Sequence, residues 1–446
     1  MTSLTLNGYE IAGLLIVAYG VVVYLLWRGG WIGKDRTLAL LGPALMIRTR
    51  RGRDLLDRVG RRVRAWSIVG DVAIVLAAIT MVAMMALLFV DAYVALTIPA
   101  SQAPSAAEAL GIPGINPIIP IGYGLVALIV GVVLHELFHG FVARSQKIGV
   151  KSLGVLWCVI PVGAFVEQDD EDMERADRRR RDRVAAAGVF ANFAIALICF
   201  AILSALVASS VAPNATGVGV LNTVSGAPAS TAGLASGDII TVFNGTPTPT
   251  NPVFAAAIAR THPNQTVAVT YYSAGVGRLV TTSIVLAANP GNRSEGFLGV
   301  YYSFLTPAQI LQSLQNPLAV ASNPITGLID WLVLPFSSLE PVQGSVAQFY
   351  HFSGPLSGAD PGTVWIGLNL LYWFAWMNFL LGASNALPLI PLDGGLLVRD
   401  YASALAMRLR KGWTVARADR FGGSLAVMSS LLVVFLILWQ FVAPRL

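Results

Sequence analysis

The sequence predicts a polytopic α-helical membrane protein, with about six transmembrane helices and one small β-rich domain outside the membrane. Three observations lead to this fold class. Hydrophobic residues make up 55% of the 446 residues and charged residues only 12%, a balance that soluble proteins do not show. Apolar stretches of membrane-spanning length recur along the chain. Between two of them, a long region changes to short alternating runs that are typical of β-strands.

Six stretches are long and apolar enough to cross the hydrocarbon core of a bilayer. They are 8–27, 68–98, 121–145, 184–211, 363–387 and 421–442. No basic segment of the kind found in signal peptides precedes the first stretch, so we expect it to remain as a helix. Cys158 and Cys199 lie in different segments, which argues against a disulfide framework.

The net charge of +6 is concentrated in a few arginine-rich segments, which is typical of the cytoplasmic flanks of membrane helices and argues against nucleic-acid binding. The basic segments are 28–66, 146–183 and 396–420. Alternation of six spans puts all three on the same side, which we expect to be the cytoplasm. The 99–120 segment and the long 212–362 region then fall outside, as do both termini.

The external region includes a β-rich stretch of sequence from Gly217 to about Val300. Within it, SGAPASTAGLASGDIITVFNG (225–245) resembles the core of a PDZ domain of the bacterial protease type. That resemblance implies binding of an extended peptide or a chain terminus as an added strand. The alternative is a spacer that binds nothing specific. Further on, TGLIDWLVLPF (326–336) is too short to span and suits a re-entrant or interfacial helix.

The third span contains VVLHELFHGF (132–141), where two histidines and a glutamate interrupt an apolar run. His135 and His139 are four residues apart, so on a helix they share one face and can bind one metal ion. Glu136 can reach water at that metal without being a ligand, which is the arrangement for metal-assisted hydrolysis. The alternative is two core histidines bonded to backbone carbonyls.

A catalytic zinc site needs a third protein ligand and one open position. Glu167 and Asp169 are the next acids, but they precede a charged segment and resemble loop acids. Asp393 in SNALPLIPLDGGLLVRD (384–400) is the better candidate, because it is an isolated acid among apolar residues at the cytoplasmic end of the fifth span. Prolines and glycines around it break the helix and allow the carboxylate to be directed inward.

An HExxH motif within a membrane helix, a downstream NALPLIPLDGG and a PDZ-like insert together resemble the site-2 protease family of intramembrane zinc metalloproteases. The resemblance implies Zn²⁺ bound by His135, His139 and Asp393, with Glu136 as the catalytic acid and base. It also implies that Asn385 contacts the substrate backbone or supports the oxyanion.

A third family element, a glycine and an asparagine after the HExxH helix, is matched loosely by Gly188 and Asn192. The family usually has Gly-Pro there, whereas this chain has Val189. Asn192 is therefore a candidate for substrate or oxyanion support, and the alternative is an interhelical hydrogen bond. The alternating and apolar residues of 152–167 suit the membrane-associated β-hairpin that family members have. An extended substrate could pair along the edge of that hairpin.

These observations predict an intramembrane endopeptidase that cleaves transmembrane protein substrates, with its active site toward the cytoplasm. One rival is a non-proteolytic receptor or scaffold that works through the PDZ-like domain, for which Glu136 would be dispensable. A metal transporter is the other, but polar residues gather around only one site. The expected segments are 1–120 (N-terminal extension), 121–211 (first catalytic part), 212–300 (PDZ-like domain), 301–362 (external linker), 363–400 (second catalytic part) and 401–446 (cytoplasmic linker and last helix).

Overall fold

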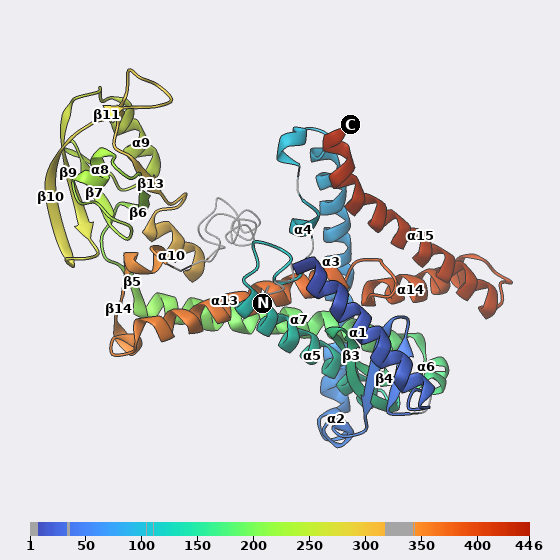
Figure 1. Ribbon diagram of the computed structural model, residues 1–446. Coiled ribbons are helices and arrows are strands. Elements are labelled where there is room, and N and C mark those ends of the chain that lie inside the picture. Colours follow the sequence, from blue (N-terminus) through green and yellow to red (C-terminus); the bar gives the residue numbers. More distant parts are fainter. Residues whose placement is uncertain (1–7, 34–35, 104, 110, 317–341, 343) are drawn as a thin grey trace, which may run out of the picture. The chain divides into compact units, whose positions relative to one another are not determined.

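The computed structural model describes residues 8–33, 36–103, 105–109, 111–316, 342 and 344–446, and Figure 1 traces its elements. The helices are α1 (Gly8–Arg28), α2 (Arg53–Gly60), α3 (Val63–Val94), α4 (Ala106–Ala109), α5 (Ile121–Ser145), α6 (Asp170–Arg175), α7 (Arg178–Ser210), α8 (Pro228–Thr231), α9 (Asn251–Ala259), α10 (Pro307–Gln315), α13 (Pro361–Asn385), α14 (Asp393–Leu409) and α15 (Val415–Val442). The strands are β1 (Leu38–Leu41), β2 (Ala44–Thr49), β3 (Val150–Cys158), β4 (Ile160–Gln168), β5 (Val211–Pro213), β6 (Val218–Thr223), β7 (Ile239–Phe243), β8 (Thr246–Pro247), β9 (Thr266–Ser273), β10 (Arg278–Val285), β11 (Ala287–Ala288), β12 (Gly296–Phe297), β13 (Val300–Tyr302) and β14 (Tyr350–Phe352). The helix predicted over 326–336 lies outside the described residues.

Five helices in the described part of the chain are long and apolar enough to cross a membrane, namely α3, α5, α7, α13 and α15. The first predicted span, 8–27, coincides with α1, whose described apolar stretch is the shorter Gly13–Arg28. The chain is therefore a polytopic helical membrane protein with an inserted β-rich region, as the composition and the apolar stretches predicted.

The basic segments between the spans contain more regular structure than the sequence analysis anticipated. The arginine run that opens at Arg178 is the first turn of α7 and not part of a linker. Ion pairs stabilise this helical arrangement: Arg183 forms two hydrogen bonds of 2.8 Å with Asp71 on α3, and Arg181 contacts Asp400 on α14 at 2.8 Å. Charges that looked like solvated topology signals thus also join neighbouring helices.

The chain divides into two compact units, one comprising 1–110, 125–196 and 377–446 and the other 111–124 and 197–376. The first unit contains a four-stranded antiparallel sheet in the order β1-β2-β3-β4. Strands β3 and β4 form the hairpin predicted over 152–167. The N-terminal hairpin of β1 and β2 extends it through pairs such as Ile47 with Val155, which the sequence analysis did not foresee.

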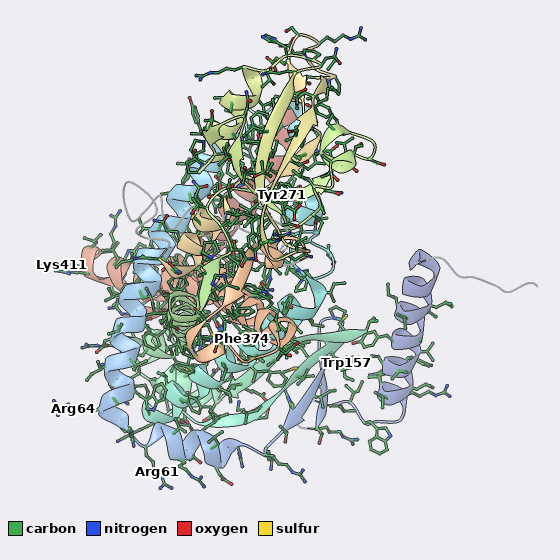
Figure 2. The ribbon with its side chains drawn as sticks, turned by 90° about the vertical axis from the view of Figure 1, so that its left-hand side faces the viewer. Arg61, Arg64, Trp157, Tyr271, Phe374 and Lys411 are labelled. Carbon is green, nitrogen blue, oxygen red and sulfur yellow. The ribbon has the colours of Figure 1, made fainter. Side chains whose placement is uncertain are left out.

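Helix α1 is attached to this sheet through one side chain. The hydroxyl of Tyr19 lies 2.7 Å from the carbonyl oxygen of Pro43 and 2.9 Å from that of Trp157, and it accepts a hydrogen bond from the N–H of Leu45. Trp157 accordingly lies at the end of the sheet beside α1 (Figure 2). Strand β4 ends the sheet order, so its outer side has no strand paired to it among the described residues.

The second unit contains the β-rich region. Its main sheet has the order β10-β9-β7-β6-β13, with β8 added beside β7, and every pairing in it is antiparallel. Side chains from the strands and from α9 form its core, with Val220, Ile240, Phe243 and Phe254 fully buried. The alternating residues of the strands thus produce the packed β-rich region that their pattern predicted.

Candidate metal centre

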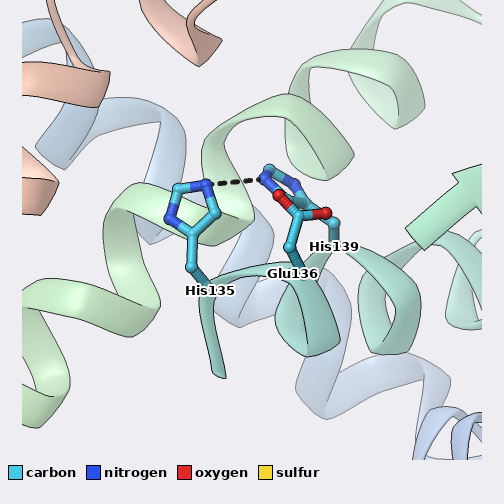
Figure 3. A group of neighbouring side chains, drawn as sticks. All are labelled: His135, Glu136 and His139. Carbon is cyan, nitrogen blue, oxygen red and sulfur yellow. Dashed lines mark hydrogen bonds between the residues drawn. The ribbon is translucent and has the colours of Figure 1, made fainter. Parts of the chain in front are cut away.

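Helix α5 brings the two histidines of the HExxH motif together. His135 and His139 are 6% and 7% exposed, one helical turn apart on the same face. Their Nε2 atoms are 3.1 Å apart, which Figure 3 marks with a dashed line. Nδ1 of His139 lies 2.7 Å from the carbonyl oxygen of Val184 on α7, and only an N–H at Nδ1 can donate to that oxygen. The lone pair of His139 Nε2 therefore remains available to a metal ion.

Asp393 approaches the same two nitrogens as the first residue of α14. Its Oδ2 lies 3.4 Å from Nε2 of His135 and its Oδ1 lies 3.4 Å from Nε2 of His139. The carboxylate is buried, and Oδ2 has no hydrogen-bond partner among the described residues. Gly394 allows this position, because a Cβ there would lie 2.2 Å from the carbonyl oxygen of Ala386. A larger residue would push the start of α14 away from the preceding loop.

The spacing of these atoms fits a metal ion. A tetrahedral zinc ion about 2.0–2.2 Å from its nitrogen and oxygen ligands places those ligands about 3.3 Å from one another. The distances of 3.1, 3.4 and 3.4 Å among the two Nε2 atoms and the two carboxylate oxygens are close to that value. Without an ion, a buried carboxylate oxygen would lack a partner, which costs free energy. His135, His139 and Asp393 thus have the spacing that the three protein ligands of a catalytic zinc site need.

Glu136 lies beside this group and is held by the sheet. One oxygen of its carboxylate and one ring nitrogen of each histidine lie within 4.8 Å of one another. Oε2 of Glu136 accepts a hydrogen bond of 3.0 Å from the N–H of Val166 on β4. This contact orients one carboxylate oxygen by a backbone donor, and the side chain remains only partly buried.

Gly188 and Asn192 on α7 both contact the ring of His135. A Cβ at Gly188 would lie 2.3–2.6 Å from three atoms of that ring, so only glycine leaves room for the imidazole. The side-chain nitrogen of Asn192 lies 3.0 Å from Nδ1 of His135, and its Oδ1 has no hydrogen-bond partner in the part of the chain that the structure describes. Turning the amide by 180° lets Oδ1 accept from an N–H at Nδ1, which leaves His135 Nε2 free for the metal.

The remaining candidates lie outside this group. Asn385 donates a hydrogen bond of 2.9 Å from Nδ2 to the carbonyl oxygen of Leu381, one turn back on α13. Glu167 forms an ion pair of 3.2 Å with Arg48, and Asp169 is the N-cap of α6. The structure thus brings Asp393, and neither loop acid, to the two histidines.

Sequence reasoning missed the groups that orient the predicted residues. Two of them are backbone atoms, the N–H of Val166 and the carbonyl of Val184, which carry no signal in the side-chain pattern. Gly188 was noted through the family resemblance, but its role as the space for an imidazole depends on how α5 and α7 pack.

The sequence matches Peptidase family M50 over residues 123–428, more than half of the chain. It is 25% identical over 317 residues to a putative zinc metalloprotease of Clostridium perfringens, covering 65% of this chain and 88% of that protein. It is 34% identical over 163 residues to an uncharacterized protein of Methanocaldococcus jannaschii, covering 36% of this chain and 42% of that protein. It is 30% identical over 163 residues to the metalloprotease MmpA of Caulobacter vibrioides, covering 26% of this chain and 40% of that protein. The last two alignments span less than half of those relatives. The matched residues include His135, Glu136 and His139 on α5 and Asp393 on α14. Because the match covers more than half of the chain, this chain belongs to Peptidase family M50, the site-2 protease family that its motifs predicted.

Proposed function

We propose that the chain is a zinc-dependent intramembrane endopeptidase that hydrolyses peptide bonds within or near the transmembrane helices of other membrane proteins. The observation that carries this proposal is the convergence of His135, His139 and Asp393 at metal-ligand spacing, with Glu136 beside them. Relatives described as zinc metalloproteases support the choice of metal and reaction.

The residues of the site have complementary roles in hydrolysis. Zinc in this position supplies a Lewis acid that polarises a scissile carbonyl and lowers the pKa of water. Glu136 accepts a proton from the attacking water and returns it to the leaving amine. In the absence of a substrate, the N–H of Val166 holds this carboxylate beside the metal ligands. The carboxylate of Asp393 offsets part of the metal charge, and Asn385 contacts the substrate backbone.

An extended substrate adds to β4. This strand ends the sheet order, and its neighbour on the other side is β3. The N–H of Val166 points away from β3 and toward Glu136, so the unpaired side of β4 runs directly past the catalytic group. A peptide that pairs with this side enters the site in the extended form that metalloproteases require. Substrate helices must therefore unwind locally, and helix-breaking residues favour cleavage.

The site lies inside the membrane and toward the cytoplasm. Helix α5 begins at Ile121, and His135 is fourteen residues further on, about 21 Å along the helix. That leaves about 10 Å of a hydrocarbon core of about 30 Å before the side that carries the arginine-rich segments. The β-rich region then lies outside, where its PDZ-like part binds a peptide or chain terminus of the substrate.

Removal of the metal tests the proposal. The purified full-length chain should contain about one zinc ion and cleave a tagged single-span reporter in liposomes. Treatment with 1,10-phenanthroline should abolish cleavage, and one equivalent of Zn²⁺, but not Mg²⁺, should restore it. Cleavage that persists in metal-free protein would exclude the metalloprotease. A chain without zinc that still binds peptides through the β-rich region would be a scaffold instead.

Asn192 should act on the metal through His135 and not on the substrate, because its side chain is fully buried. We expect Asn192→Ala to weaken zinc binding by about 10–100-fold, the usual effect of losing a group that orients a metal-bound histidine. Asn192→Asp, which can still accept from Nδ1–H, should retain most of the affinity. Zinc affinity is measured by competition with a chromophoric chelator. An alanine variant with unchanged affinity and an impaired KM would restore the substrate-contact role.

A further inference from the structure

A cavity of about 320 Å³ lies in the first unit at the end of the four-stranded sheet. Neither the metal centre nor the proposed reaction uses it. Its lining residues are Arg36, Thr37, Arg48, Thr49, Arg50, Lys151, Ser152 and Glu167. The lining thus has four cationic side chains and three hydroxyl groups but only one acidic side chain. Such a cavity is complementary to an anion.

Two of the four cations are already engaged. Arg48 pairs with Glu167 at 3.2 Å, and Lys151 contacts Asp170 at 2.8 Å. The hydrogen bond with Asp170 raises the pKa of the Lys151 amine, which therefore stays cationic at neutral pH. Arg36 and Arg50 form no ion pair with any residue that the structure describes, although both line the cavity. Two guanidinium groups are therefore available for a ligand.

With α1 inserted in a bilayer, the opposite end of the sheet would lie at the depth of acyl chains. Tyr19 binds this end through Pro43 and Trp157. It precedes Arg28, the basic last residue of α1, by nine residues, or about 14 Å of helix. A basic residue at the end of an apolar helix marks the membrane surface. The end of the sheet held by Tyr19 is thus about 14 Å inside that surface, close to the middle of a core about 30 Å thick.

The length of β3 sets how far the cavity lies from the end of the sheet that Tyr19 binds. From Trp157 to Lys151 β3 advances six residues, or about 20 Å. A strand of this length is long enough to reach from the depth of Tyr19 to the membrane surface, which would place Lys151 and the cavity among the lipid headgroups. The inner end of the sheet carries exposed apolar side chains, among them Leu40, Leu41 and Trp157, as contact with acyl chains requires. The sheet thus has one end suited to the bilayer interior and one suited to its anionic surface.

We propose that this cavity binds the phosphate headgroup of an anionic phospholipid, with Arg36 and Arg50 as its principal ligands. One guanidinium group can donate two parallel hydrogen bonds to two oxygens of a phosphate. The hydroxyl groups of Thr37 and Thr49 add donors at the same end of the sheet. A lipid is the favoured source of the phosphate because the cavity lies where headgroups are. The proposal does not depend on proteolysis. The bound lipid would fix the depth of the sheet whose strand β4 contacts Glu136.

The test measures lipid retention by the full-length chain. Protein reconstituted in phosphatidylcholine containing 10% phosphatidylglycerol is extracted gently, and its bound lipids are counted by native mass spectrometry. We expect about one phosphatidylglycerol to remain on the parent in preference to phosphatidylcholine. Retention should fall at least tenfold in the Arg36→Gln, Arg50→Gln double variant. A matched double variant, Arg408→Gln with Arg410→Gln, changes basic residues outside the cavity and should retain the lipid like the parent.

Three outcomes would overturn the proposal: no preference for phosphatidylglycerol in the parent, equal retention in the two double variants, or displacement of the lipid by 10 mM inorganic phosphate. The last would indicate a site for free phosphate. Both substituted side chains are exposed, so the fold should tolerate their replacement. The parent measurement decides between the two lipids even if a variant is not recovered, and zinc content reports separately on the integrity of the metal centre.

Discussion

Replacing Glu136 by glutamine should leave one zinc ion per chain and reduce cleavage by about 10²–10⁴-fold, the usual contribution of a general acid and base. Glutamine has nearly the same shape, and its carbonyl oxygen can still accept the hydrogen bond from Val166. It cannot take a proton from water. Metal analysis and single-turnover cleavage of the reporter, carried out on the same preparation, separate these two effects.

Glu174→Gln is the matched control for this experiment, because it removes an exposed acid from α6 outside the metal centre. It should cleave like the parent. A Glu136→Gln variant that retains zinc and cleaves at the parental rate would remove the proposed proton carrier. Loss of zinc in that variant would instead make Glu136 part of the ligand set.

Gly188→Ala should strongly weaken zinc binding and, as a result, cleavage. The added Cβ would lie 2.3 Å from Cε1 and 2.4 Å from Nε2 of His135, well inside any tolerated contact. The ring must move, and its Nε2 then leaves the position opposite Asp393. We expect zinc affinity to fall by more than about 100-fold, because one of three protein ligands is displaced.

Gly423→Ala provides a control within α15, where a Cβ would meet no atom within 4 Å. Alanine is the better helix former, so this variant should be as stable as the parent or slightly more stable. The two substitutions are chemically identical and differ only in their surroundings. Normal zinc content in Gly188→Ala would mean that α5 and α7 separate more readily than their packing indicates.

The parts of the fold that the sequence predicted are those governed by hydrophobic pattern. Apolar length identified the membrane-spanning helices but not shorter ones such as α14, and alternation identified both the β-rich region and the hairpin of β3 and β4. The N-terminal hairpin was missed because its residues lie among arginines, which suggested a solvated linker. Strand β2 pairs with β3, more than 100 residues further on, and the local sequence pattern gives no sign of so distant a partner.

The candidate site divides in a similar way. Side chains with distinctive chemistry and spacing, such as His135, His139 and Asp393, could be proposed from the sequence, and the structure places them together. For Asn192 the sequence left two roles open, substrate support or an interhelical hydrogen bond. Its complete burial against His135 favours the second. That distinction depends on the packing of α7 against α5, which no motif encodes.

The hydrogen bond between Val166 and Glu136 gives the proposed enzyme an order of events. The amide that holds the carboxylate lies on the unpaired side of β4, so an incoming peptide strand in this register competes for the same hydrogen atom. While no peptide is present, the base is tethered to the backbone. Arrival of a correctly aligned strand releases it at the moment when a scissile bond is in place. The enzyme would then stay inactive until its substrate binds, without any separate lid.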